Sequence, residues 1–106
     1  MKRVLFYNVT GQQLSMSPEH DYKGIVRNTK NYLYVYFKFD GTWARMNKVL
    51  EASNEHDFSD SHAVAIVNET AMIPNEVTDS KDIYIRVHGM NKGVSIVTNK
   101  VHIEQT

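Results

Sequence analysis

The chain has 106 residues, twelve of them Lys or Arg and twelve Asp or Glu, so its formal net charge is zero. This length supports one domain with a single core, residues 1–106, and the neutral balance excludes a general positive field that would attract nucleic acid or an anionic membrane. The chain has no cysteine, which excludes a disulfide framework, a thiolate nucleophile and cysteine-ligated zinc.

The N-terminal segment predicts no targeting signal. Lys2 and Arg3 are followed by a run of only about four apolar residues, far short of the hydrophobic region of a signal peptide. No apolar run elsewhere reaches the roughly 20 residues that a membrane helix needs. We therefore expect a protein that is made and kept in the cytoplasm until it is assembled or released by lysis.

The first third of the chain alternates apolar and polar residues with a period of two, which is typical of strands. Val4 and Phe6 alternate before a turn at residues 10–11, and Leu14 and residues 25–26 indicate further short strands. The clearest strand covers residues 32–39. On its inward face we expect Leu33, Val35, Phe37 and Phe39, and on its outward face Tyr32, Tyr34, Tyr36 and Lys38.

The rest of the chain repeats this pattern in shorter pieces. Residues 48–53 and 63–68 favour strands, as does 82–88, with its branched residues inward and Tyr84, Arg86 and His88 outward. Residues 94–104 predict a last strand that is interrupted at 98–100 by a bulge or bend.

Glycines mark the turns between these strands. Residues 40–41 and 91–93 predict turns, and the only helical candidates are brief, at 43–47 and 74–77. Seven or eight short strands at this spacing predict an all-β antiparallel sandwich or barrel.

The segment 56–62 gathers side chains that could bind a metal: His56, Asp57, Asp60 and His62. Their spacing matches no known ligand motif, and a solvated loop between two strands explains the same residues. The chain has no Gly-x-Ser-x-Gly, no His-Glu-x-x-His and no glycine-rich phosphate loop. Asp40, Glu51 and Asp82 show no sign of pairing as catalytic carboxylates. We therefore predict no catalytic residue, no cofactor and no enzymatic activity.

The aromatic residues are the most informative surface candidates. Tyr32, Tyr34 and Tyr36 would form a row on one sheet face, able to anchor a protein partner or stack on a sugar. A covering loop or a second packed layer would instead bury the ring bodies. Trp43, the only tryptophan, either joins this platform or plugs the end of the core.

From Tyr34 to Ile103, the order of motifs resembles a module of structural proteins from bacteriophages of Gram-positive bacteria. That module runs from a Phe-x-Phe strand to a turn with tryptophan, an apolar strand, a variable loop and a Val-Pro or Ile-Pro turn. A strand ending in Val-x-Gly follows, and then a segment ending in Pro-Thr-Asn or Thr-Thr-Asn before the last strand. The matching segments here are residues 37–39, 41–43, 49–54, 73–77, 87–90 and 97–103. The chain departs from the module at residues 51–52, where an aromatic residue is expected.

The resemblance implies an immunoglobulin-like β-sandwich that is a non-enzymatic part of a virion, as a head fibre or decoration protein or as a tail or baseplate component. Its expected partners are other virion proteins and further copies of the chain in a homo-oligomer. One alternative is an adhesion module that binds cell-wall carbohydrate through Tyr32, Tyr34, Tyr36 and Trp43. Another is a small phage inhibitor of a host defence protein, although such inhibitors are often strongly acidic and this chain is neutral.

Overall fold

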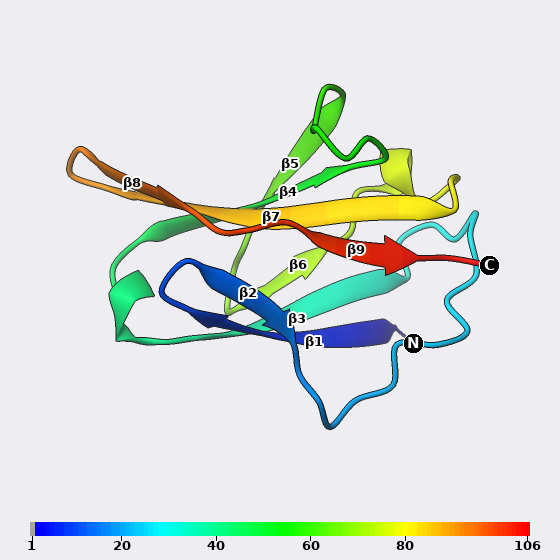
Figure 1. Cartoon of the computed structure of the whole chain (residues 1–106), viewed down its shortest axis with the longest axis horizontal. Coiled ribbons are helices and arrows are strands. Elements are labelled where there is room, and N and C mark those ends of the chain that lie inside the picture. The colour runs from blue at the N-terminus through cyan, green and yellow to red at the C-terminus, as the bar shows by residue number, and fades with distance from the viewer. Residues whose placement is uncertain (1) are drawn as a thin grey trace.

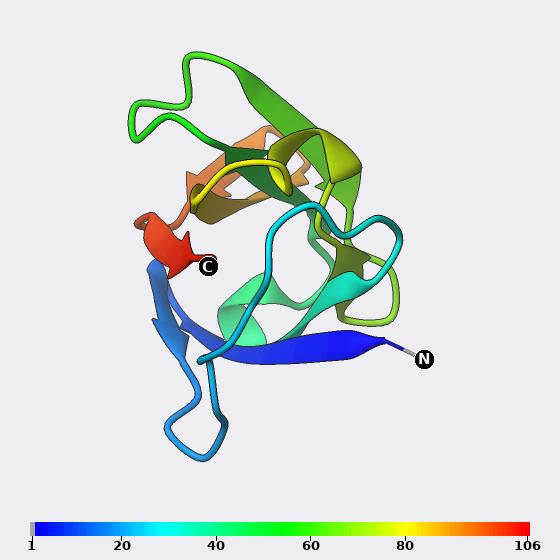
Figure 2. The same cartoon turned by 90° about the vertical axis from the view of Figure 1, so that its right-hand side faces the viewer.

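The computed structural model describes residues 2–106 as two β-sheets packed face to face (Figures 1 and 2). Sheet A has the strand order β2-β1-β3-β6, with β1 at Arg3–Thr10, β2 at Gln13–Met16, β3 at Leu33–Phe39 and β6 at Thr70–Met72. Sheet B has the order β5-β4-β7, and both β8 and β9 then pair with β7. Its strands are β4 at Asn47–Ser53, β5 at Ser61–Ala65, β7 at Asp82–Asn91, β8 at Val94–Val97 and β9 at Val101–Glu104.

The all-β sandwich is thus confirmed, with corrections to the strands. There are nine strands in residues 2–106 rather than seven or eight, because β6 was not predicted and the last segment is two separate strands. Residues 25–26 form no strand. The pairing is antiparallel except between β1 and β3, which run parallel with Phe6 opposite Tyr36.

The parallel pair requires a long connection, since the chain must return to the starting end of sheet A. β2 runs back along β1 as far as Tyr7, and residues 17–32 complete the return and close one end of the sandwich. Ile25 is buried there, and its carbonyl accepts a hydrogen bond of 2.8 Å from the backbone N–H of Thr106. The Tyr22 hydroxyl lies between the backbone carbonyls of Phe6 and Ser17, which share its one O–H as acceptors. The segment is therefore tied down at both ends despite lacking regular structure.

The core lies between the sheets and is built from alternate residues of the long strands. In β3 and β7 the predicted inward residues are buried, namely Leu33, Val35 and Phe37, and Ile83, Ile85 and Val87, whereas Phe39 at the end of β3 is only partly buried against the core. In β1, the strand that Val4 and Phe6 predicted is present, but these two residues do not face the core. The buried residues there are Leu5, Tyr7 and Val9, while Val4 and Phe6 lie on the outer face.

Trp43 plugs one end of this core. It sits in a single 3-10 turn, η1 at Gly41–Trp43, that Asp40 caps by accepting a hydrogen bond from the N–H of Thr42. The indole is fully buried and donates from Nε1 to the carbonyl of Gly11, 2.7 Å away. Trp43 packs against Gly89 of β7, where a Cβ atom would lie only 2.6 Å from the ring. The second helical candidate is present as a single 3-10 turn, η2 at Asn75–Val77, whereas the first, residues 43–47, is not helical beyond Trp43. Neither helix of residues 2–106 is long enough to cross a membrane.

The two sheets are joined along one side by a side chain. Between β8 and β9, the Asn99 side-chain oxygen accepts from the N–H of Leu14 at 2.7 Å, and its Nδ2 donates to the Leu14 carbonyl at 3.0 Å. Asn99 thus gives β2 the two hydrogen bonds that a neighbouring strand would supply. The predicted interruption at residues 98–100 is what frees this side chain for the role.

Candidate functional site

The outer face of sheet A carries a cluster of aromatic rings. Because β1 and β3 are parallel and in register, Phe6 lies beside Tyr36 with ring centroids 5.7 Å apart. His20, from the loop after β2, stacks on Phe6 at 4.0 Å with the ring planes only 19° apart. Tyr34 precedes Tyr36 by two residues on the same face of β3, and the Lys2 ammonium lies 4.3 Å from the centre of its ring. We call these four residues, Phe6, His20, Tyr34 and Tyr36, the aromatic face.

Polar groups border the aromatic face on one side. A shallow pocket of about 210 Å³ lies beside Phe6 and Tyr36 and is also lined by Asn8, Glu19 and Lys38. Tyr36 is 37 % exposed although it lies in the middle of a sheet. The face therefore combines flat apolar rings, fixed by a rigid sheet, with hydrogen-bonding groups at the edge.

The four residues predicted as a platform do not lie together. Tyr34 and Tyr36 project from the outer face of β3, and Tyr32 is 39 % exposed but precedes the strand and lines a different pocket with Arg3 and Val26. Trp43 is fully buried at the end of the core, so it is not part of any exposed platform. Its large apolar surface fits the space opposite Gly89, as the core-plug interpretation required.

Sequence reasoning missed Phe6 and His20 as members of this face. Five successive residues from Val4 to Asn8 include four that are apolar or aromatic, so a period of two assigns either set to the core. The pairing of β1 with β3 decides between them, and that contact is between distant parts of the chain. His20 lies in an irregular loop and carried no pattern at all.

A second polar cluster lies on the outer face of sheet B. Glu51 of β4 stands opposite Arg86 of β7, and its Oε1 accepts hydrogen bonds from Arg86 Nε at 2.5 Å and from His88 Nε2 at 2.7 Å. Burial alone would raise the pKa of Glu51, but the hydrogen bonds from Arg86, His88 and Ser61 outweigh it and lower the pKa to about 2. The carboxylate is therefore a fixed anion, and no sequence pattern indicated this pairing.

The segment 56–62, whose last two residues belong to β5, supports this cluster from outside. Phe58 is buried, and the Arg86 guanidinium lies 4.1 Å above its ring. The backbone carbonyl of His56 accepts a hydrogen bond from Lys100, and His62 approaches Asp60 only to 3.8 Å. Among residues 2–106, no group of three His, Asp or Glu side chains is placed to hold a metal ion. The observed role of the loop is to cover the outer side of β7.

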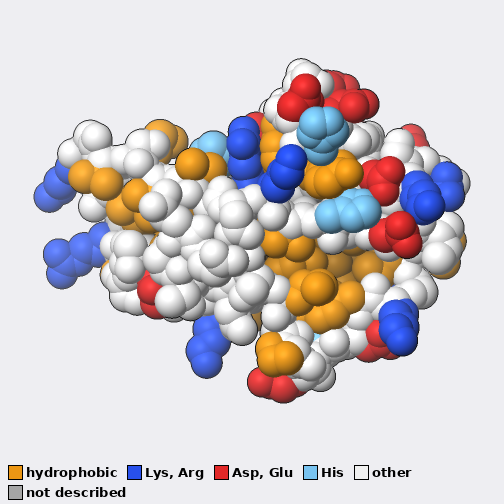
Figure 3. All heavy atoms as spheres, in the orientation of Figure 1, with side chains coloured by type: hydrophobic (Ala, Val, Ile, Leu, Met, Phe, Trp, Pro, Cys, Tyr) orange, Lys and Arg blue, Asp and Glu red, His pale blue; other side chains and the backbone are white. Residues whose placement is uncertain are grey.

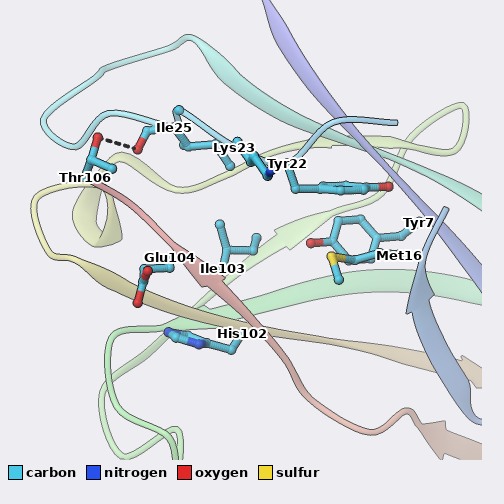
Figure 4. Close-up of a pocket in the computed structure, with 10 residues that line it drawn as sticks. Tyr7, Met16, Tyr22, Lys23, Ile25, His102, Ile103, Glu104 and Thr106 are labelled. Carbon is cyan, nitrogen blue, oxygen red and sulfur yellow. Dashed lines mark hydrogen bonds between the residues drawn. The ribbon is translucent and has the colours of Figure 1, made fainter. Parts of the chain in front are cut away.

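A cavity of about 380 Å³ opens along the side of the sandwich between β2 and β9 (Figure 4). Tyr7 and Met16 line it from sheet A, Ile103 lines it from sheet B, and Tyr22 and Ile25 close it from the long loop. The Tyr7 hydroxyl points into the cavity, and burial raises the pKa of this phenol, so Tyr7 remains neutral. Hydrophobic side chains gather on this face of the molecule (Figure 3).

Comparison of the chain with protein-family models, with curated proteins and with solved structures found no significant match. The features of the molecule that bear on its function are therefore the aromatic face, the polar cluster and the cavity.

Proposed function

We propose that the chain is an immunoglobulin-like β-sandwich that acts by binding, as a structural protein of a bacteriophage virion that docks on another virion protein through its aromatic face. The observation that carries this proposal is the pairing of Phe6 and Tyr36 on an exposed sheet surface. Rings held by a sheet lose little conformational freedom on binding, because the strands already fix them.

The composition of the face favours a protein partner. Protein interfaces are enriched in aromatic residues at their centre and are polar at the rim, and each buried aromatic ring contributes about 150–250 Å². Here the rings of Phe6, Tyr34 and Tyr36 form the centre, and Glu19 and Lys38 supply charges of both signs at the edge. Mixed charges at the rim give specificity in docking without attracting one class of polyanion.

The resemblance to phage structural modules gives the proposal its biological setting. Its motifs run from β3 to β9, and Phe37 and Phe39, Trp43, Pro74 and Gly89 all occupy core positions or the turns between strands. Residues of this kind define a scaffold rather than a reactive site. The two-sheet arrangement fits the immunoglobulin-like class, with the parallel β1–β3 pair as a variation at the N-terminus.

The test is to quantify the protein in purified phage particles by mass spectrometry while the host supplies either the wild type or a variant. Tyr36→Ala should reduce the number of copies per particle, because it removes the centre of the aromatic face. Tyr32→Ala is the matched control, since Tyr32 has the same chemistry and nearly the same exposure, 39 % against 37 %, outside that face. Absence of the wild-type protein from particles, or equal incorporation of both variants, would refute the proposal.

A carbohydrate-binding role is the second candidate, and the pocket beside Tyr36 is the observation that favours it. The rings of Phe6 and Tyr36 can stack on a sugar ring. The neighbouring Asn8, Glu19 and Lys38 side chains can form hydrogen bonds with its hydroxyl groups. Titration with cell-wall polysaccharide fragments, followed by NMR, should then shift the signals of Phe6 and Tyr36. A titration without such shifts would exclude carbohydrate binding at this pocket, and protein docking would be the one role left for the aromatic face.

A further inference from the structure

The outer edge of β9 carries backbone groups that β7 does not use. Gln105 N–H donates to the carbonyl of Lys81 at 2.7 Å, and Ile103 pairs with Ile83, so residues 103 and 105 face β7. Backbone hydrogen bonds alternate sides along an antiparallel strand. The N–H and C=O groups of His102 and Glu104 therefore point away from β7, toward the gap between β9 and β2.

Both ends of this edge are already covered. On one side, Asn99 bonds to β2 at Leu14, and on the other, Thr106 is held between the Ile25 carbonyl and the Arg27 N–H. Residues 102–104 lie between these contacts and border the 380 Å³ cavity. In Figure 4, Ile103 reaches into this cavity while His102 and Glu104 lie on its rim. An uncovered strand edge beside an apolar hollow is a site where a further strand can pair.

We propose that this strand is β9 of a second copy of the chain, paired antiparallel about a two-fold axis at Ile103. In that register, His102 stands opposite the partner's Glu104, and the partner's His102 stands opposite Glu104. Each of these pairs exchanges two backbone hydrogen bonds, so four bonds join the copies. The outward groups of residues 102 and 104 are all used, and the two B sheets become one continuous sheet.

The side chains favour this occupant over an unrelated strand. His102 and Glu104 both lie on the outer face of sheet B, where His102 Nε2 is bonded to Asp82 at 2.7 Å and Glu104 lies 3.8 Å from Lys81. In the proposed register these polar pairs of the two copies lie next to one another across the seam. On the inner face, Ile103, which is only 4 % exposed, stands opposite the partner's Ile103 beside the half-exposed Met16. The backbone groups and the apolar residues of the edge therefore match those of a second copy, as a two-fold interface requires.

This inference extends the assembly role proposed above, because it names the contact between copies, but it does not use the aromatic face. Its first test is sedimentation velocity of the whole chain over a wide concentration range. The Glu104→Pro variant removes the outward N–H of residue 104 and leaves the ladder to β7 intact. Loss of the two symmetry-related bonds should raise the dimer dissociation constant about tenfold to a hundredfold. Glu104→Ala, which keeps the N–H, is the matched control and should have a smaller effect.

Single cysteine variants test the register, since the chain has no cysteine of its own. In the proposed dimer the two Cα atoms of residue 103 lie about 4.5 Å apart, within reach of a disulfide. Residue 101 stands opposite residue 105 of the second copy, so the two Cα atoms of residue 101 are separated by four residues along the strands, about 13 Å. Ile103→Cys should therefore form a disulfide-linked dimer under mild oxidation, and Val101→Cys should not.

Several results would overturn the inference. They are a monomer at every concentration, a dimer that Glu104→Pro does not weaken, or equal cross-linking of Ile103→Cys and Val101→Cys. A monomer that still enters phage particles, and loses that ability with Tyr36→Ala, would overturn the dimer alone. A dimer with the predicted register that is absent from particles would instead refute the virion role.

Discussion

The contact between Trp43 and Gly89 provides a quantitative test of the core. A methyl group at position 89 would lie 2.6 Å from Cζ3 and 2.9 Å from Cε3 of the indole. Carbon atoms in contact normally stay about 3.5–4.0 Å apart, so the ring would have to move by about 1 Å. Trp43 is fully buried and hydrogen-bonded to the Gly11 carbonyl, so it has no free direction in which to move.

We therefore expect Gly89→Ala to lower the free energy of unfolding by about 2 kcal/mol. Overpacking a buried site typically costs about 1–3 kcal/mol, and the gain from replacing a strand glycine offsets at most about 1 kcal/mol of that. In a Trp43→Phe background the smaller ring leaves room for the methyl group. The cost of Gly89→Ala should then fall by about 1 kcal/mol, as a coupling between two residues in contact.

Urea denaturation measures these differences directly. Fluorescence of the single tryptophan reports unfolding of the wild type and of Gly89→Ala, and circular dichroism serves for the Trp43→Phe variants. Gly41→Ala is the control, because no atom lies within 4 Å of the Cβ position there. If Gly89→Ala were as stable as Gly41→Ala, or if its cost were unchanged by Trp43→Phe, the packing argument would be wrong.

Three further predictions concern polar contacts. Glu51 has a pKa of about 2 instead of the usual 4.5, so its contribution to stability is complete above about pH 5 and disappears as the pH falls toward 2. Urea denaturation of Glu51→Gln should therefore show a free energy of unfolding lower than that of the wild type by about 2 kcal/mol at pH 7, and by less at pH 3. Thr98→Val should cost about 1–3 kcal/mol in thermal denaturation, because Thr98 Oγ1 accepts the buried N–H of Val87, whereas Thr98→Ser should retain most of the stability. Asn99→Ala should speed hydrogen exchange at the Leu14 amide by at least about fivefold, because this amide loses its acceptor. Exchange that became faster throughout the protein would show a global loss of stability and contradict this local role of Asn99.

Sequence patterns predicted the elements whose two faces differ clearly. Residues 32–39 and 82–88 alternate, and residues 98–100 break the alternation, so β3, most of β7 and the break before β9 were all recognised. In β1 both faces are apolar, and only its parallel pairing with β3 selects Leu5 and Tyr7 for the core. Local sequence patterns alone could therefore not predict that the outer-face residues of β1 and β3 lie side by side in the aromatic face.

The environment of Trp43 illustrates the same limit from the other direction. Nothing near residue 43 reveals whether the indole is exposed, because the space that it fills is created by a glycine on β7. The pairing of Glu51 with Arg86 likewise depends on the register between β4 and β7, which fixes which outward residues become neighbours. Both are contacts between distant segments, and both become visible only when strands are placed side by side.

The position of β7 has a consequence for the order in which the protein folds. This strand pairs with β4, β8 and β9, which follow one another closely in the sequence apart from β4. The contacts of Thr106 with Ile25 and Arg27 instead join residues 81 and 79 positions apart. Because contacts between distant segments carry a larger loop-closure cost, we expect the hairpin of β7 and β8 to form early and the end of the sandwich to close last.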